Sequence, residues 1–185
     1  MGSRRKTGRN MGSVYRPVFT PSARTRGAFS KTALKPLRQS NPAEDGKIDL
    51  FTGISGKFDT PVGADKPAPI FEGGSYEFKF LASKGAKLDF VTMFGPSNDL
   101  FYAPRQAIHL FDAKGNPITG DVTDKFLLWD AGTEVNQPPG IGPDQAPLQK
   151  APKTGAREHG VVHLVNDGFI YPKTTSVMRV TISVQ

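Results

Sequence analysis

Alternation of apolar and polar residues is the dominant pattern in the second half of the chain. Residues 76–80 alternate aromatic with charged side chains, and residues 178–184 alternate apolar with polar ones. A period of two is typical of a strand with one buried face. Residues 88–94 carry apolar side chains on both faces, which indicates a central strand. Further short apolar runs, which also predict strands, lie at residues 107–111, 126–129 and 161–165.

Turn-forming residues separate these runs, and no segment has a helical period longer than two turns. Short strands with closely spaced turn signals are typical of two packed antiparallel sheets. The pattern therefore predicts an all-β fold, specifically an antiparallel β-sandwich.

Charge divides the chain into two unequal parts. The formal net charge is +7, but ten of the 24 Lys and Arg residues lie within residues 1–39, which contain no acid. The remaining 14 basic residues face all 17 acidic ones. We therefore predict a basic, extended and weakly ordered arm over residues 1–39 and a mildly acidic β-sandwich domain over residues 40–185.

The arm has three interpretations that its composition leaves open. It is a solvated tail or an arm that lies on its own domain, it docks on an acidic partner, RNA or anionic lipid, or it is a segment of the organellar transit type. No run approaches the roughly 18 apolar residues of a membrane span, so no transmembrane segment is expected. The absence of cysteine excludes disulfides and zinc sites built on sulfur.

Three carboxylates, Asp99, Asp130 and Glu134, follow the ends of apolar runs, in segments rich in Gly, Pro and Asn. Acids at such positions are either solvated turn residues or ligands for a hard cation. Calcium takes six to eight oxygen ligands, which strand-end loops supply from carboxylates and backbone carbonyls. Asp130 and Glu134 are separated by Ala-Gly-Thr, small enough for a curled loop to bring them together. The spacing alone leaves both interpretations open.

Three stretches carry a family resemblance. Residues 71–76 read Phe-Glu-Gly-Gly-Ser-Tyr, residues 92–101 read Thr-Met-Phe-Gly-Pro-Ser-Asn-Asp-Leu-Phe, and residues 129–136 read Trp-Asp-Ala-Gly-Thr-Glu-Val-Asn. Together they resemble the spondin N-terminal domain family, which includes modules of F-spondin and mindin and bacterial spondin-domain proteins. The resemblance covers roughly residues 41–185. Its most specific part is the Asp-Ala-Gly-Thr-acid motif combined with Pro-Ser-x-Asp upstream.

The resemblance implies a C2-like β-sandwich that binds Ca²⁺ at one end, with Asp99, Asp130 and Glu134 as the ligands. It also implies a non-enzymatic adhesion or interaction module with a protein partner, located outside the cell or in the periplasm. Two departures favour the bacterial branch, since the chain has no cysteine and has Leu100 where animal members have tryptophan. Residues 1–9 are too charged to supply the family's first strand.

A structural role and an enzymatic role are the other functions to consider. The alternative is a structural subunit of a larger assembly, membrane-associated in one version, docked through the basic arm and a Pro/Gly/Gln-rich loop at residues 136–157. An enzyme is not expected, because no P-loop, Gly-x-Ser-x-Gly or dinucleotide motif occurs. We expect His109 and His163 to be packed core or interface residues rather than ligands, and His159 to be a loop residue.

Overall fold

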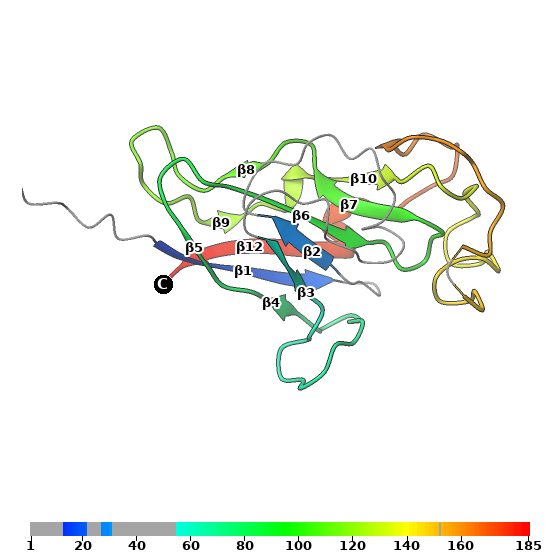
Figure 1. Ribbon diagram of the computed structural model, residues 1–185, viewed down its shortest axis with the longest axis horizontal. Helices are drawn as coiled ribbons and strands as arrows, with labels where there is room; N and C mark the ends of the chain where they lie inside the picture. The colour runs from blue at the N-terminus through cyan, green and yellow to red at the C-terminus, as the bar shows by residue number, and fades with distance from the viewer. Residues whose placement is uncertain (1–12, 22–26, 31–54, 152) are drawn as a thin grey trace, which may run out of the picture.

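β-Strands, arranged in two antiparallel sheets, make up almost all the regular structure that the described residues form (Figure 1). The computed structural model describes residues 13–21, 27–30, 55–151 and 153–185, and side chains from residue 56 onward. The helical elements in these ranges are one 3-10 turn, η1 (Thr123–Lys125), and one short helix, α2 (Thr174–Val177). No helix within these ranges is long and apolar enough to cross a membrane.

The smaller sheet has the strand order β4-β1-β12-β9, and β5 also pairs with β1. Its longest ladder joins the two ends of the chain, since β1 runs antiparallel to β12 from Tyr15↔Val184 to Pro21↔Met178. The strands are β1 (Ser13–Pro21), β4 (Tyr76–Glu77), β5 (Phe80–Ala82), β9 (Gly120–Asp121) and β12 (Met178–Val184).

The larger sheet has the order β11-β10-β7-β6-β2-β3, and β8 also pairs with β6. Strand β7 is buried along its whole length between β6 and β10. The strands are β2 (Gly27–Ser30), β3 (Ser55–Phe58), β6 (Lys87–Met93), β7 (Leu100–Pro104), β8 (Ile108–His109), β10 (Phe126–Asp130) and β11 (His163–Leu164). One of the two sheets is curled into a half-barrel.

The main apolar core takes side chains from both sheets. Phe90 of β6 and Phe126 of β10 pack with ring centroids 4.4 Å apart, and Val180 and Ile182 of β12 are fully buried in the same cluster. Apolar burial of this kind is the main favourable contribution to folding. It holds β6, β7 and β10 in fixed positions, and the turn between β6 and β7 and the loop after β10 carry the polar cluster described below.

The prediction of a mostly β fold with antiparallel sheets is confirmed. The runs at residues 88–94, 126–129 and 178–184 correspond to β6, β10 and β12. The runs at 76–80, 107–111 and 161–165 are only partly strand, as β4 and β5, β8 and β11. Strand β7 was not predicted.

Two strands, β1 and β2, lie within residues 1–39, the range predicted as an extended, weakly ordered arm. Strand β1 is hydrogen-bonded to β12 on one side and to β4 and β5 on the other. The backbone of residues 13–21 is therefore an inner strand of a sheet. The rest of the predicted arm, and the boundary at residues 39 and 40, lie outside the described residues.

Candidate metal centre

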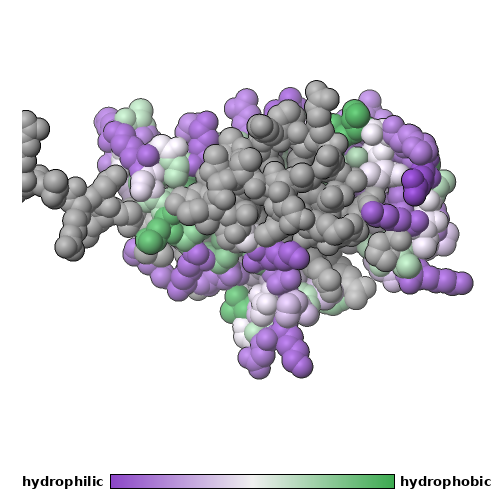
Figure 2. All heavy atoms as spheres, in the orientation of Figure 1, coloured by the Kyte–Doolittle hydropathy of each residue, from purple (hydrophilic) through white to green (hydrophobic). Residues whose placement is uncertain are grey.

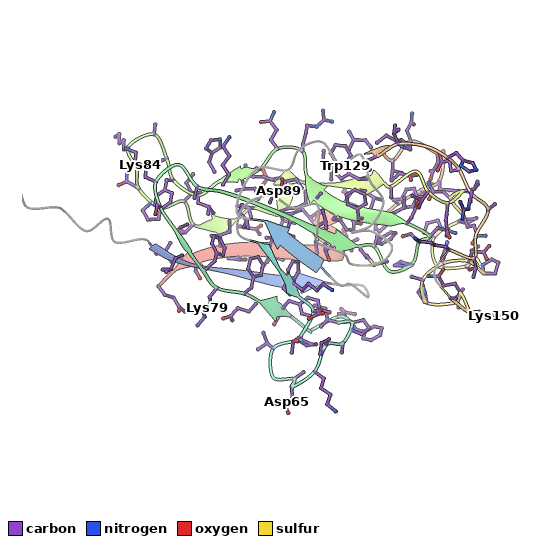
Figure 3. All side chains as sticks on the ribbon, in the orientation of Figure 1. Asp65, Lys79, Lys84, Asp89, Trp129 and Lys150 are labelled. Carbon is purple, nitrogen blue, oxygen red and sulfur yellow. The ribbon has the colours of Figure 1, made fainter. Side chains whose placement is uncertain are left out.

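Loops from three parts of the chain meet at one end of the molecule, where the yellow and orange segments gather at the right of Figure 1. They are the turn after β6, the loop after β10 and the segment before β11. Trp129, labelled in Figure 3, lies where β10 runs into this loop end, and its Nε1 donates to the Ala103 carbonyl at 3.0 Å. Asp130, the next residue, ends β10 between its partners Leu100 of β7 and His163 of β11.

Asp99 is fully buried and is held by the loop that follows β10. Its Oδ2 accepts hydrogen bonds from the Thr133 backbone N–H at 2.8 Å, the Thr133 hydroxyl at 2.6 Å and the Glu134 backbone N–H at 3.1 Å. Its Oδ1 is also buried and has no hydrogen-bond partner among the residues that the structure describes. An unpaired buried carboxylate oxygen is costly and requires an explanation.

The electrostatics at Asp99 follow from this burial. Loss of solvent is the largest effect and raises its pKa from 3.8 to about 6. The hydrogen bonds from Thr133 and Glu134 act in the opposite direction, while the negative charge of Asp130 raises the pKa further. Asp99 and Asp130 are therefore close enough to repel each other when both are ionised.

Asp130 ends β10 and is almost fully buried. Its Oδ1 accepts from the Gly132 backbone N–H at 2.6 Å, and its Oδ2 accepts from the Asn136 side-chain amide. The negative charge of Asp130 also raises the pKa of Tyr171. Burial is the largest cause of that rise, Asp167 is the next, and Asp130 and Asp99 add to it. The centre is thus a region of negative potential at this end of the sheet.

Glu134 is buried beside Asn98, the residue before Asp99. Its Oε1 accepts from the Gly155 backbone N–H at 3.3 Å, and its Oε2 lies 3.5 Å from the Asn98 side-chain nitrogen. The Asn98 Oδ1 is a second buried oxygen without a hydrogen-bond partner. Two oxygens without partners thus belong to adjacent residues in one turn.

A close backbone approach places residues 156–160 against the loop after β10. The Gly160 N–H donates to the Gly132 carbonyl at 2.7 Å, and the Glu158 N–H donates to the Thr133 carbonyl at 3.1 Å. A Cβ on Gly132 would lie 2.8 Å from backbone atoms of Gly160 and Val161, so only glycine fits there. A cavity of about 240 Å³ opens beside this crossing, and Arg157 and His159 are among its lining residues.

Two further side chains, those of Glu158 and His163, lie close to Asp130 beside this crossing. Ligand atoms of Asp130, Glu158 and His163 all lie within 4.8 Å of one another, which makes these three residues a candidate metal-binding group. His163 is opposite Asp130 in the β10–β11 ladder, and its Nε2 lies 4.0 Å from Asp130 Oδ2.

The three carboxylates predicted from sequence are all buried at this end of the molecule. Of the three, only Asp130 belongs to the group of converging ligand atoms found among the described residues. Asp99 and Glu134 instead approach each other through the bond from the Glu134 backbone to Asp99. Both candidate arrangements share Asp130.

His163 and His109 were predicted to be core or interface residues; a core position is wrong for both, and an interface position stays a prediction. His163 is not packed in the core: its side chain is 43% exposed, because the two-residue strand β11 lies at the edge of the sheet. His109 is exposed as well, and His159 is a loop residue as predicted, with a positive φ of 61°. Glu158 was missed. In the sequence its only signal is its position five residues before His163, because its approach to Asp130 depends on the loop crossing.

No model of a known protein family matches the chain, and no curated protein matches it.

Proposed function

We propose that this protein is a non-enzymatic, calcium-stabilised interaction module of the spondin-domain class, built on a C2-like β-sandwich. Ca²⁺ would bind at the loop end, with Asp99, Asp130 and Glu134 as its carboxylate ligands. The observation that carries the proposal is Asp99, a fully buried acid with one oxygen that has no hydrogen-bond partner.

Burial of negative charge is the main argument for a cation. The three carboxylates are each at most 4% exposed, and in the described part of the chain no Lys or Arg forms an ion pair with any of them. Burying unpaired charge is strongly unfavourable unless a counter-charge compensates it. A divalent cation supplies that compensation and accepts the buried oxygens of Asp99 and Asn98 as ligands.

The surface around the centre supports a role in protein contact. Val135, Ile141, Leu148, Val161 and Ile170 are large apolar residues that are about half exposed or more, and all lie in the segments around the centre. Figure 2 shows mostly hydrophilic side chains at the same end in that view, so the apolar residues are interspersed among polar ones. Exposed apolar side chains with a polar surround are typical of contact sites.

Calcium would act on this surface by fixing the loops. Gln145 is fully buried and already organises the predicted loop at residues 136–157, because its side chain bonds the backbone of Gly140, Gln137 and Pro138. This loop in turn bonds the turn that carries Asp99, through Ala146 N–H to the Ser97 carbonyl at 3.0 Å. A cation at Asp99 would therefore stabilise the shape of the contact face.

The second candidate is a structural subunit docked through this same loop. It is favoured by Ile141 and Leu148, which are 75% and 55% exposed. The two functions differ in their response to a chelator. Contact made by a calcium-stabilised module requires the ion, whereas docking through apolar loop residues alone persists when the ion is removed.

Thermal unfolding in calcium and in EGTA tests the proposed function. A ligand present at 100 times its Kd stabilises the native state by about 2.7 kcal/mol. In a domain of this size we expect Tm to rise by roughly 5–10 °C. Asp99→Asn should abolish the rise, whereas Asp112→Asn, at an exposed turn acid, should leave it intact. An equal Tm with and without saturating calcium would contradict the proposal.

A further inference from the structure

We propose that Asp130, Glu158 and His163 form a second cation site, selective for a borderline transition-metal ion of the zinc class rather than for calcium. The site would have three protein ligands and a coordination position open to solvent. It is independent of the calcium proposal, although Asp130 belongs to both.

Backbone pairing holds the three ligands together. Asp130 and His163 are directly opposite each other in the antiparallel pair of β10 and β11. Glu158 is fixed by the bond from its own N–H to the Thr133 carbonyl at 3.1 Å, two residues before the closely packed Gly160. Opposed residues in such a ladder have adjacent side chains. The proximity of Asp130 and His163 is therefore a consequence of sheet register, and the backbone crossing of the loops brings Glu158 beside them.

The imidazole of His163 is oriented as in a metal ligand. Its Nδ1 lies 2.8 Å from the Val161 carbonyl oxygen, which can only accept a hydrogen bond, so Nδ1 carries the proton. In the neutral imidazole Nε2 is then the free lone-pair nitrogen, and it is the atom on the side of Asp130. A ligating histidine typically donates its other N–H to such a partner, which fixes its tautomer and ring orientation.

The spacing suits one shared ion. The 4.0 Å between His163 Nε2 and Asp130 Oδ2 is too long for a hydrogen bond. Zinc bonds nitrogen and oxygen at about 2.0–2.2 Å, so two of its ligand atoms lie at most about 4.2 Å apart and closer at tetrahedral angles. A small movement of the exposed His163 and Glu158 side chains toward Asp130 is enough.

The mixed donor set favours a zinc-class ion. Imidazole nitrogen suits zinc, copper, nickel and iron, whereas calcium takes oxygen ligands. The two carboxylates balance the charge of a divalent ion. Asp130 is itself oriented by Gly132 and Asn136, in the way that outer contacts orient a metal-bound carboxylate. With three ligands on a partly exposed edge, the fourth position is left to water, as in open zinc sites.

Isothermal titration of the chelator-treated full chain with ZnCl₂ tests this site. We expect one zinc ion per chain and at least a tenfold loss of affinity in His163→Ala and in Glu158→Gln. His109→Ala removes an exposed histidine of β8 that lies outside the group, and it should bind zinc like the wild type. Co²⁺ provides a second readout, since its visible spectrum should change when the nitrogen ligand of His163 is lost.

Unchanged zinc affinity in His163→Ala, or an equal loss in His109→Ala, would overturn the site. His163 is an exposed edge residue, so its substitution should leave the fold intact, and circular dichroism checks this. The two metal proposals remain separable. His163→Ala should keep the calcium-dependent rise in Tm, and Asp99→Asn should keep zinc affinity within about threefold, less than half the free-energy change of a tenfold loss.

Discussion

Asp99 is the residue at which structure and proposed function are most directly linked. Its Oδ2 is bound by three donors, and this arrangement favours the ionised form, while burial disfavours it more strongly. The opposing effects leave its pKa at about 6 in the folded chain. At neutral pH the folded protein therefore contains a buried carboxylate that ionises at a cost in stability.

This cost predicts a pH dependence of folding with a definite sign. The unfolded chain releases the Asp99 proton near the ordinary value of 3.8, and the folded chain releases it at about 6. Between these values the folded state binds more protons, so its free energy of unfolding falls as pH rises and is constant above about 6. The difference of about two units corresponds to roughly 3 kcal/mol.

Urea unfolding in EGTA at pH 4 and at pH 7 measures this effect. The wild type should lose up to about 3 kcal/mol more than Asp99→Asn over this interval, since the variant removes the titrating group but leaves the other acids. Saturating calcium should reduce the difference, because a cation favours the ionised carboxylate. Equal pH dependence in the two proteins would show that Asp99 is not the group responsible.

Sequence predicted some of these residues and not others. Asp99, Asp130 and Glu134 follow apolar runs that are visible in the sequence, so their positions just past strand ends could be predicted, but not their convergence. Glu158 and His163 could not be linked to Asp130 in the same way. Their proximity depends on the register of a two-residue strand, and a shift of one residue would turn His163 to the other face.

At the scale of elements, the crossing between residues 130–134 and 156–160 organises the centre. It consists of backbone hydrogen bonds between loops, including an isolated bridge of Glu134 with Arg157. It exists because two glycines let the backbones approach more closely than side chains allow. Lys150, labelled in Figure 3, is at the outer end of the loop that leads from β10 to this crossing.

Gly132→Ala should disrupt the crossing. The new Cβ would lie 2.8 Å from backbone atoms, and residue 132 has a positive φ of 69°, which alanine rarely adopts. We expect a loss of about 1–3 kcal/mol in the free energy of unfolding and a loss of zinc affinity, because Glu158 moves away from Asp130.

Gly140→Ala is the matched control for this substitution. Gly140 has a positive φ of 83°, but an added Cβ would meet no atom closer than 4.0 Å. It therefore carries the conformational cost without the steric clash. It should lose only about 1 kcal/mol and retain zinc binding. If the two variants behave alike, the close approach of the loops is not what assembles the group.

A clear apolar pattern, rather than length alone, made a strand predictable, since the nine-residue β1 was not predicted. β6, β10 and β12 are five or seven residues long, and each has an unambiguous apolar pattern. β7 was missed because Leu-Phe-Tyr-Ala-Pro has no polar alternation, as expected of a strand buried on both faces. Strands of two residues, such as β8 and β11, carry too few side chains to show a period.

For the whole molecule, the ladder between β1 and β12 connects the start of the described chain to its end. Seven residue pairs join these strands, and β4 and β5 pair along the other side of β1. Composition concealed this, because the basic residues that surround β1 obscure its apolar positions. A segment that resembles a charged tail in sequence therefore forms an inner strand in the structure.

Deleting residues 1–21 should consequently unfold the domain rather than shorten it. The deletion leaves the hydrogen-bonding groups of β12 and β4 unpaired along β1 and opens the core at Val180 and Ile182, both at most 1% exposed. We expect loss of the cooperative thermal transition and of near-ultraviolet circular dichroism. A detached arm would instead leave both signals unchanged.

Removing basic residues while keeping β1 distinguishes the contribution of the strand to stability from the contribution of the charge. Replacing Arg4, Arg5, Lys6 and Arg9 with glutamine keeps β1 and removes four of the ten basic residues in residues 1–39. Because the substitutions leave the β1–β12 ladder intact, this variant should keep the wild-type Tm within about 2 °C. If it instead unfolds like the deletion, the segment stabilises the domain through its charge rather than through the β1–β12 ladder.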